Sequence, residues 1–398
     1  MSKVVKLEEL CLPDQIGKYG IPAVAEEFSE DKVRYLRITD IDDYGNLLEN
    51  DKKSVSSHEI EKYILKEGDI VFARTGNSTG RTYFHEEKNG ELAFAGFLIK
   101  FSLDESKVNP KYLKYFTISK PYKQWVDNLS NGSTRGNINA KTFADCPIIL
   151  PPRAQQDYLV RVLSSLEEKI QTNNQINQEL ETMAKTLYDY WFVQFDFPDQ
   201  NGKPYKSSGG KMVYHPELKR EIPEGWGVES VGNLLDKVTK AEKIENNSIE
   251  FIGKIPVIDQ SQKYIAGFTN NENGLIQPQK GHVIFGDHTR VVKYINFDYA
   301  RGADGTQVLI SNNENISNVL LYHMIEDFDL SNYGYARHFK FLKEKIVIVP
   351  DKKVSSKFEI QANVIYEKIK NNIFENQELT QLRDWLLPML MNGQVKVE

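Results

Sequence analysis

Four short loops combine glycine with arginine, asparagine, serine or threonine, a set of side chains that can read the edges of nucleic-acid bases. The four loops are residues 74–81, 131–137, 286–290 and 333–338, and they follow predicted strands. Arginine can bond guanine, and asparagine can bond adenine, through two hydrogen bonds each. The same residue types also form ordinary polar turns, which is the alternative interpretation of any single loop. The candidate DNA contacts are Arg74, Asn77, Arg81, Ser133, Arg135 and Asn137 in the first half of the chain, and Arg290, Lys293, Tyr335, Arg337, His338 and Lys340 in the second.

The sequence contains no recognisable motif for catalysis, for a nucleotide cofactor or for a metal. The run Gly80-Arg81-Thr82 is similar to the end of a phosphate-binding loop, but Thr75 stands where that motif needs glycine, and Arg81 where it needs lysine. The 7 histidines are scattered without metal-binding spacing, and the 2 cysteines, Cys11 and Cys146, lie far apart in the chain. We therefore expect no catalytic residue and no metal site.

The composition is that of an ordinary globular protein. A chain of 398 residues predicts two or three domains, and the mean hydropathy of −0.50, with no apolar run of about 18 residues, argues against a transmembrane helix. The first residues, Met1 to Lys6, lack the apolar core of a signal peptide, so we expect a cytoplasmic protein. The net charge of −6 does not exclude DNA binding, because binding depends on a local basic patch.

Two segments of the chain repeat each other. Asn177-Gln178-Glu179-Leu180 recurs as Asn376-Gln377-Glu378-Leu379, and Glu168-Lys169-Ile170 recurs as Glu367-Lys368-Ile369. Both matches have the same offset of 199 positions (376 − 177 and 367 − 168). A shared offset predicts an internal duplication of the chain.

The repeated segments predict two long helices with matching seams. Apolar residues alternate spacings of four and three, which is the heptad pattern of helices that pair. A helix that simply faces a core is the alternative for one such stripe, but two matched stripes favour mutual pairing. Two asparagine layers in each seam favour one register. The seam residues are Leu159, Leu163, Leu166, Ile170, Asn173, Asn177, Leu180 and Leu187 in the first helix, and Ile365, Ile369, Asn372, Asn376, Leu379 and Leu386 in the second.

Three positions interrupt the pattern. We expect Leu382 to take the place of Arg383 in the second seam, and Met183 to take the place of Ala184 in the first. We also expect Pro388 to end or kink the second helix.

The order of predicted elements indicates an α+β fold. It comprises two mixed α/β domains separated by a long antiparallel two-helix coiled coil, with a pseudo-two-fold internal repeat. The predicted boundaries are a first domain at residues 1–152, a first long helix at 153–193, a linker at 194–225, a second domain at 226–350 and a second long helix at 351–393.

The chain resembles the specificity (S) subunit of type I restriction-modification systems over nearly its whole length. The resemblance rests on four features, which are the run from Gly68 to Gly76, the helix entry Pro151-Pro152-Arg153-Ala154-Gln155-Gln156, the matched Asn-Gln-Glu-Leu helices, and the linker from Phe195-Asp196-Phe197-Pro198 to Ile222-Pro223-Glu224-Gly225-Trp226. The second helix entry, Pro350-Asp351-Lys352-Lys353, lacks the second proline and the glutamine pair.

The resemblance implies a non-catalytic subunit of a DNA adenine methyltransferase and ATP-dependent endonuclease. Each recognition domain would read one half of a bipartite double-stranded DNA target, and the helices would set the spacer. The implied partners are two methyltransferase (M) subunits and restriction (R) subunits, which would carry S-adenosylmethionine, ATP and Mg, with no cofactor on this subunit and no membrane. A free-standing DNA- or RNA-binding protein and a coiled-coil scaffold are the competing hypotheses.

Overall fold

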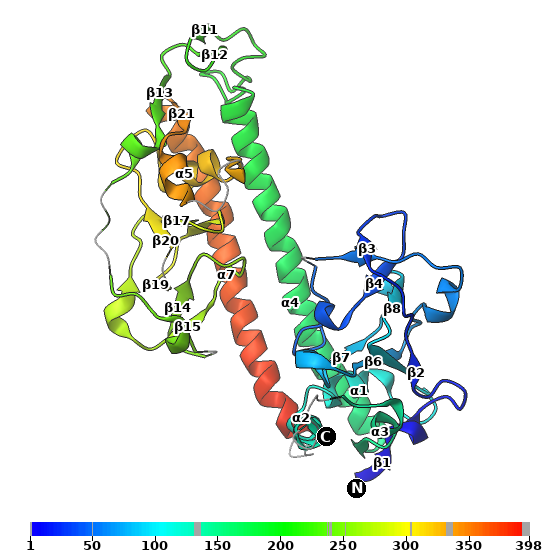
Figure 1. Ribbon diagram of the computed structural model, residues 1–398. Coiled ribbons are helices and arrows are strands. Elements are labelled where there is room, and N and C mark those ends of the chain that lie inside the picture. The colour runs from blue at the N-terminus through cyan, green and yellow to red at the C-terminus, as the bar shows by residue number, and fades with distance from the viewer. Residues whose placement is uncertain are drawn as a thin grey trace. The chain divides into compact units, whose positions relative to one another are not determined.

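The computed structural model shows a mixed helix and sheet protein with two long helices (Figure 1). It describes residues 2–49, 51–130, 137–236, 238, 241–250, 252–302, 305–331 and 337–391. The chain divides into two compact units. Unit 1 comprises Met1–Ile170 together with Gln377–Glu398, and unit 2 comprises Gln171–Asn376.

Unit 1 is built on a four-stranded sheet in the order β2-β9-β6-β7. All five residues of the central strand β6 are buried, which fits the continuous apolar run in its sequence. A second sheet has the order β3-β5-β4-β8, with β4 and β8 parallel, and β1 pairs with β10. The strands are β1 (Lys3–Lys6), β2 (Lys18–Tyr19), β3 (Glu26–Glu27), β4 (Arg34–Leu36), β5 (Lys53–Ser54), β6 (Asp69–Ala73), β7 (Thr82–Phe84), β8 (Leu92–Phe94), β9 (Leu98–Ser102) and β10 (Pro147–Leu150).

Three short helices cover the first sheet of unit 1, namely α1 (Pro110–Phe116), α2 (Lys120–Ser130) and α3 (Ala140–Ala144). Helix α1 begins at Pro110, because the Asn109 side chain accepts a hydrogen bond from the Lys111 N–H and Pro110 suits the first helical position. Asn139 caps α3 in the same way, at 2.9 Å from the Thr142 nitrogen. These caps fix the loops that precede the helices.

Unit 2 repeats much of this plan. Its sheets have the orders β18-β17-β20 and β15-β14-β19-β16, β14 and β19 are parallel like β4 and β8, and β13 pairs with β21. The elements are β13 (Gly227–Ser230), β14 (Ile255–Ile258), β15 (Gly267–Thr269), β16 (Leu275–Ile276), β17 (His282–Gly286), β18 (Val292–Ile295), β19 (Tyr299–Arg301), β20 (Thr306–Leu309), α5 (Asn318–Ile325), α6 (His338–Lys343) and β21 (Ile346–Val349).

The segment predicted as a linker, residues 194–225, is more ordered than its composition indicates. It contains the hairpin of β11 (Met212–His215) and β12 (Arg220–Pro223). The Phe197 ring stacks on Trp226 at 5.0 Å and on Tyr205 at 4.6 Å between centroids. This aromatic packing supplies the apolar burial that a Gly- and Ser-rich segment otherwise lacks.

The long helices are α4 (Arg153–Tyr188), which continues into a π-helical turn at Asp189–Val193, and α7 (Lys352–Met391). Within unit 2, Asn173 Nδ2 donates to Asn376 Oδ1 at 2.9 Å, and Asn372 Nδ2 donates to Asn177 Oδ1 at 2.8 Å. Numbers rise on one helix as they fall on the other, so the helices are antiparallel here. Both asparagine layers therefore pair across the two helices.

The remaining seam residues are at least partly buried. In unit 1, Leu159 and Leu163 share a core with Leu387 and Met391, and Leu386 packs against it. In unit 2, Ile369 is fully buried, and Leu180, Leu187 and Ile365 pack against the core. Leu166, Ile170 and Leu379 are intermediate in exposure.

Two predictions about the interruptions were wrong, and a third needs adjustment. Ala184 and Arg383 are buried at 0% and 8% exposure, whereas Met183 and Leu382 are 58% and 41% exposed, so the seam keeps its heptad positions without substitutes. Helix α7 does not end at Pro388 but continues to Met391. Pro388 lies in the last described turn, where few later hydrogen bonds depend on it.

Candidate nucleic-acid interface

In unit 1 the first candidate loop closes tightly at the end of β6. Ala73 N–H donates to the Arg81 carbonyl, and Gly80 N–H donates to the Ala73 carbonyl, both at 2.8 Å. Arg74 and Arg81 therefore stand at the two ends of the loop. Asn77 is exposed on the turn Gly76–Ser78.

Arg74 joins this loop to the second candidate loop of unit 1. Its Nε donates to Asn137 Oδ1 at 3.2 Å, and its carbonyl accepts from Ile138 N–H at 2.9 Å. The guanidinium lies 5.0 Å from the centre of the Tyr19 ring, within the range of a cation–π contact. The structure thus brings Arg74 and Asn137 together, while the candidates Ser133 and Arg135 lie outside the described residues.

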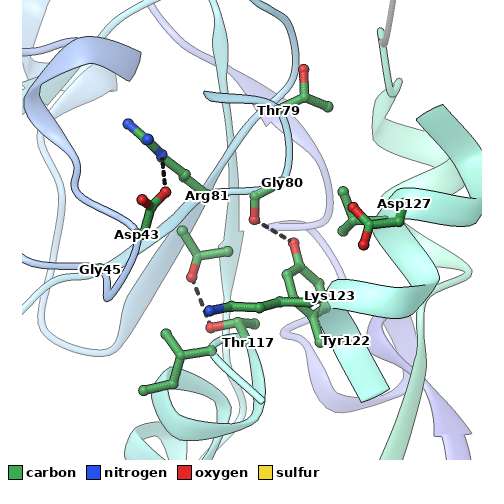
Figure 2. A pocket seen from close by; sticks show the side chains of 12 residues that line it. Asp43, Gly45, Thr79, Gly80, Arg81, Thr117, Tyr122, Lys123 and Asp127 are labelled. Carbon is green, nitrogen blue, oxygen red and sulfur yellow. Dashed lines mark hydrogen bonds and ion pairs between the residues drawn. The ribbon is translucent and has the colours of Figure 1, made fainter. Parts of the chain in front are cut away.

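Arg81 borders a pocket of about 230 Å³ (Figure 2). Its Nε donates to Asp43 Oδ1 at 2.7 Å, and a terminal nitrogen donates to the Ile41 carbonyl at 3.1 Å. Across the pocket, the Tyr122 hydroxyl donates to the Gly80 carbonyl at 2.9 Å. The guanidinium is therefore held in one orientation by the turn that carries Asp43.

In unit 2 the loop after β17 is joined to the loop before α6. The Asp287 carbonyl accepts from His338 N–H at 3.0 Å, and its carboxylate accepts from Phe339 N–H at 2.9 Å. Arg290 is exposed on the first loop with a φ of 65°, which an arginine adopts only when its surroundings impose it. Arg337 is exposed on the second loop, and Lys340 is exposed in α6.

The two units therefore share one backbone joint. Ile138 N–H donates to the Arg74 carbonyl in unit 1, and His338 N–H donates to the Asp287 carbonyl in unit 2. In both units the acceptor is the residue that directly follows the central strand, β6 or β17. The side chains at these matched positions, Arg74 and Asp287, carry opposite charges. The backbone geometry is repeated, and the chemistry displayed on it is not.

Two candidates in unit 2 lie inside the unit and not on its surface. Lys293 is 4% exposed, and its ammonium group donates to the carbonyls of Asp259, at 2.9 Å, and Lys263. This burial lowers the pKa of Lys293 to about 8. His338 is 3% exposed, and its Nδ1 lies 3.0 Å from the Asp287 carbonyl oxygen. Neither side chain can contact a ligand in this arrangement, and Tyr335 lies outside the described residues.

Sequence reasoning missed the partners of the predicted arginines. Tyr19 contacts Arg74, and Asp43 contacts Arg81. Neither is near its arginine in sequence. Only the pairing of β2 with β9, and of β9 with β6, brings Tyr19 to the end of β6. The sequence offered one indication of the contact with Arg74, which is that Tyr19 is an aromatic residue in a polar segment.

The described residues show no arrangement for metal or thiol chemistry. Within these ranges no group of three or more histidine, cysteine or acidic side chains is placed to hold a metal ion. Burial raises the pKa of Cys11 and Cys146 to about 12, so both thiols stay protonated at neutral pH and are poor nucleophiles. Among the helices of the described ranges, none combines the length and apolarity needed to span a bilayer.

Comparison with known proteins finds a family domain in the first part of the chain and relatives that match most of it. Residues 2–182 match the family described as type I restriction modification DNA specificity domain. The MjaIX specificity subunit of Methanocaldococcus jannaschii, a type I restriction enzyme subunit, is 25% identical over 313 residues, which cover 72% of this chain and 69% of the relative. The HindI specificity subunit of Haemophilus influenzae is 22% identical over 417 residues, covering 84% of this chain and 88% of the relative.

A solved structure shares the fold. The S subunit of a type I restriction-modification system from M. genitalium aligns with a TM-score of 0.55 and 15% identity over 98% of this chain and 96% of that chain. Residues 2–182 thus match a type I restriction modification DNA specificity domain, and the chain is similar over most of its length to specificity subunits of type I restriction enzymes.

Proposed function

We propose that each unit reads one half of a bipartite double-stranded DNA target. The observation that carries this proposal is the repeated joint, at Arg74 and Ile138 in unit 1 and at Asp287 and His338 in unit 2. Each joint holds two polar loops at the end of a buried strand. The backbone joint is the same in both units, whereas the side chains on its loops differ in charge. This combination is expected of two related modules that read different DNA sequences.

The candidate side chains that reach the surface at these joints are the proposed DNA contacts. They are the half-buried Arg74 and Arg81 with the exposed Asn77 and Asn137 in unit 1, and the exposed Arg290, Arg337 and Lys340 in unit 2. Arginine and asparagine read base edges through paired hydrogen bonds, whereas lysine serves chiefly as a phosphate contact. A net charge of −6 gives little long-range attraction for DNA, so the lone subunit is expected to bind weakly.

The remaining chemistry is proposed to lie in partner subunits. We infer that the chain assembles in the cytoplasm with two methyltransferase subunits and with restriction subunits. These would hold S-adenosylmethionine, ATP and Mg. The two long helices would dock the methyltransferase subunits and set the spacer between the half-sites. The antiparallel asparagine pairs support this role because they fix one register.

A segment exchange tests the proposal. Residues 1–152 are replaced with the matching segment of a relative that has a different target. The methylated adenines are then mapped in a host that carries this exchanged chain and its methyltransferase subunit. One half of the methylated motif should change and the other should stay. The reciprocal exchange of residues 226–350 should change only the other half. A single exchange that changes both halves of the motif would contradict separate reading. So would two exchanges that leave both halves unchanged.

A further inference from the structure

The turn between Ile41 and Leu47 is a rigid platform in unit 1. Asp42 Oδ1 accepts from the N–H groups of Tyr44 and Asn46, both at 2.8 Å, and the Asn46 side chain returns a hydrogen bond to Asp42 Oδ2 at 3.0 Å. Gly45 has a φ of +77°, and a Cβ there would lie 2.9 Å from the Thr82 carbonyl oxygen. The turn therefore has one conformation and lies directly against β7.

This platform orients Arg81 from two sides. The Ile41 carbonyl and the Asp43 carboxylate, one residue on each side of Asp42, accept hydrogen bonds from the guanidinium at 3.1 and 2.7 Å. Figure 2 shows Asp43 facing the guanidinium at the edge of the pocket. A displacement of the turn would therefore move Arg81.

Helix α7 holds the same platform. Arg383 lies on the part of α7 that belongs to unit 1, and its guanidinium carbon is 4.9 Å from the centre of the Tyr44 ring. Lys123 Nζ on α2 lies 5.7 Å from the same ring. Burial and the nearby Asp384 carboxylate raise the pKa of Tyr44, so the ring stays neutral. Two cations from two helices thus contact one aromatic side chain on the turn.

Arg383 is not needed simply to fill the seam. It occupies a heptad position at 8% exposure, where leucine would pack without the cost of desolvating a charge. Within the part of the chain that the structure describes, its guanidinium pairs with the carboxylate of the adjacent Asp384, at 2.7 Å. A buried arginine whose guanidinium lies against an aromatic ring of the platform indicates a role at that ring.

We propose that Arg383 is a positioning residue for the first half-site: through Tyr44 it fixes the turn 41–47, which in turn orients Arg81. The inference rests on the proposed function, since it assumes that Arg81 contacts DNA. It makes the reading of one half of the target depend on the C-terminal helix, far away in sequence from residues 1–152. An exchanged first domain without an aromatic residue at the position of Tyr44 would lose this support.

The test uses the full chain assembled with its methyltransferase subunits. Arg383→Met and Tyr44→Leu remove the cation and the ring, whereas Arg383→Lys and Tyr44→Phe keep a cation and a ring. Gln381→Met is the matched control, because it places the same new side chain at an exposed position of the same helix. Affinity is measured for DNA with single base changes in each half of the target.

Arg383→Met and Tyr44→Leu should lower the discrimination at positions of the first half-site by about two- to fivefold, the weight of one cation–π contact. Discrimination in the second half-site should not change. The two conservative variants and Gln381→Met should behave like the parent chain. Equal losses in both half-sites, or no loss in either, would overturn the proposal.

Two further measurements separate this inference from the proposed function. Hydrogen exchange of residues 41–47 and 79–82 in the isolated chain reports the platform without DNA, and it should be faster in Arg383→Met. Unchanged exchange would refute the contact itself. Arg81→Met tests the assumption about Arg81. If exchange rises in Arg383→Met but Arg81→Met leaves discrimination intact, Arg81 is not a base contact and the positioning role fails, while separate reading by the two units still stands.

Discussion

At the scale of single residues, Lys293 gives unit 2 a stability that depends on pH. Burial lowers the pKa of Lys293 from 10.5 to about 8, although the nearby Asp259 carboxylate opposes the shift. Between these two values the unfolded chain binds more protons than the folded one. Stability therefore rises as the pH increases from about 8 towards 10.5, by at most about 1.4 kcal/mol per pH unit. Below pH 8 the charged ammonium imposes a constant penalty.

Urea unfolding of the parent chain and of Lys293→Met at several pH values between 7 and 10 measures this effect. The difference in unfolding free energy between the two proteins should be flat near pH 7 and should then shift in favour of the parent chain. Methionine leaves two carbonyls without a donor, but that loss is the same at every pH. A difference that does not vary with pH would show that the amine stays charged throughout.

The sequence predicted the loop that carries Arg74 and Asn77, but not which of the candidate side chains face solvent. Residue type and turn composition place Arg74 and Asn77 in a loop after a strand. The burial of Lys293 depends on carbonyls of Asp259 and Lys263, some 30 residues away and turned inward by other strands. No local pattern reports such a contact.

At the scale of elements, the asparagine layers between α4 and α7 act as coupled pairs. Asn173 donates to Asn376 at 2.9 Å and to Glu375 at 2.8 Å. Asn173→Leu alone should destabilise the chain by about 1–3 kcal/mol, because it removes the hydrogen bonds to Asn376 and Glu375 from a partly buried layer. Adding Asn376→Leu should cost less than the sum of the single changes, since two leucines pack together in a seam.

A double-mutant cycle by urea unfolding measures the coupling, which we expect to be about 0.5–3 kcal/mol. Gln178→Leu, on the exposed face of α4, is the control and should show no coupling to Asn376→Leu. Additive effects of Asn173→Leu and Asn376→Leu would mean that the layer does not act as a unit.

The long helices and the central strands were predictable because their patterns are local. The heptad spacing identified α4 and α7, and the strand predicted before the loop at residues 74–81 is β6. The hairpin of β11 and β12 was missed because its stability comes from Phe197, Tyr205 and Trp226, which meet only in the folded chain. The roles of Ala184 and Arg383 were also missed, since apolar neighbours appeared better suited to the seam.

At the scale of the whole molecule, the helix pair is proposed to act as a ruler between the half-sites. One heptad is inserted between Ile170 and Gln171 in α4, and another between Glu378 and Leu379 in α7. Whole heptads keep the seam in phase and preserve the asparagine pairs. Each helix becomes longer by about 10 Å, which at roughly 3.4 Å per base pair equals about three base pairs of spacer.

Mapping of methylated adenines should show both half-sites unchanged and a longer spacer. The same heptad inserted between Gly209 and Gly210, outside the helices, is the control and should leave the spacer as it was. A spacer that is unaffected by the paired insertions, or half-sites that change with it, would exclude the ruler.

The pairing of Asn173 with Asn376 and of Asn177 with Asn372 also has a consequence for synthesis. Helix α4 leaves the ribosome long before its partner, since roughly 200 residues separate the paired asparagines, a delay of about 10–40 s at ordinary rates of translation. During that interval the seam of α4 is complete and unpaired. Because the asparagine pairs are related by a pseudo-two-fold axis, the α4 helices of two nascent chains can pair in an antiparallel way through the same seam. Nascent chains on neighbouring ribosomes of one messenger RNA would thus compete with the chain's own α7 for pairing with α4. Rapid covering of the α4 seam would favour the monomer.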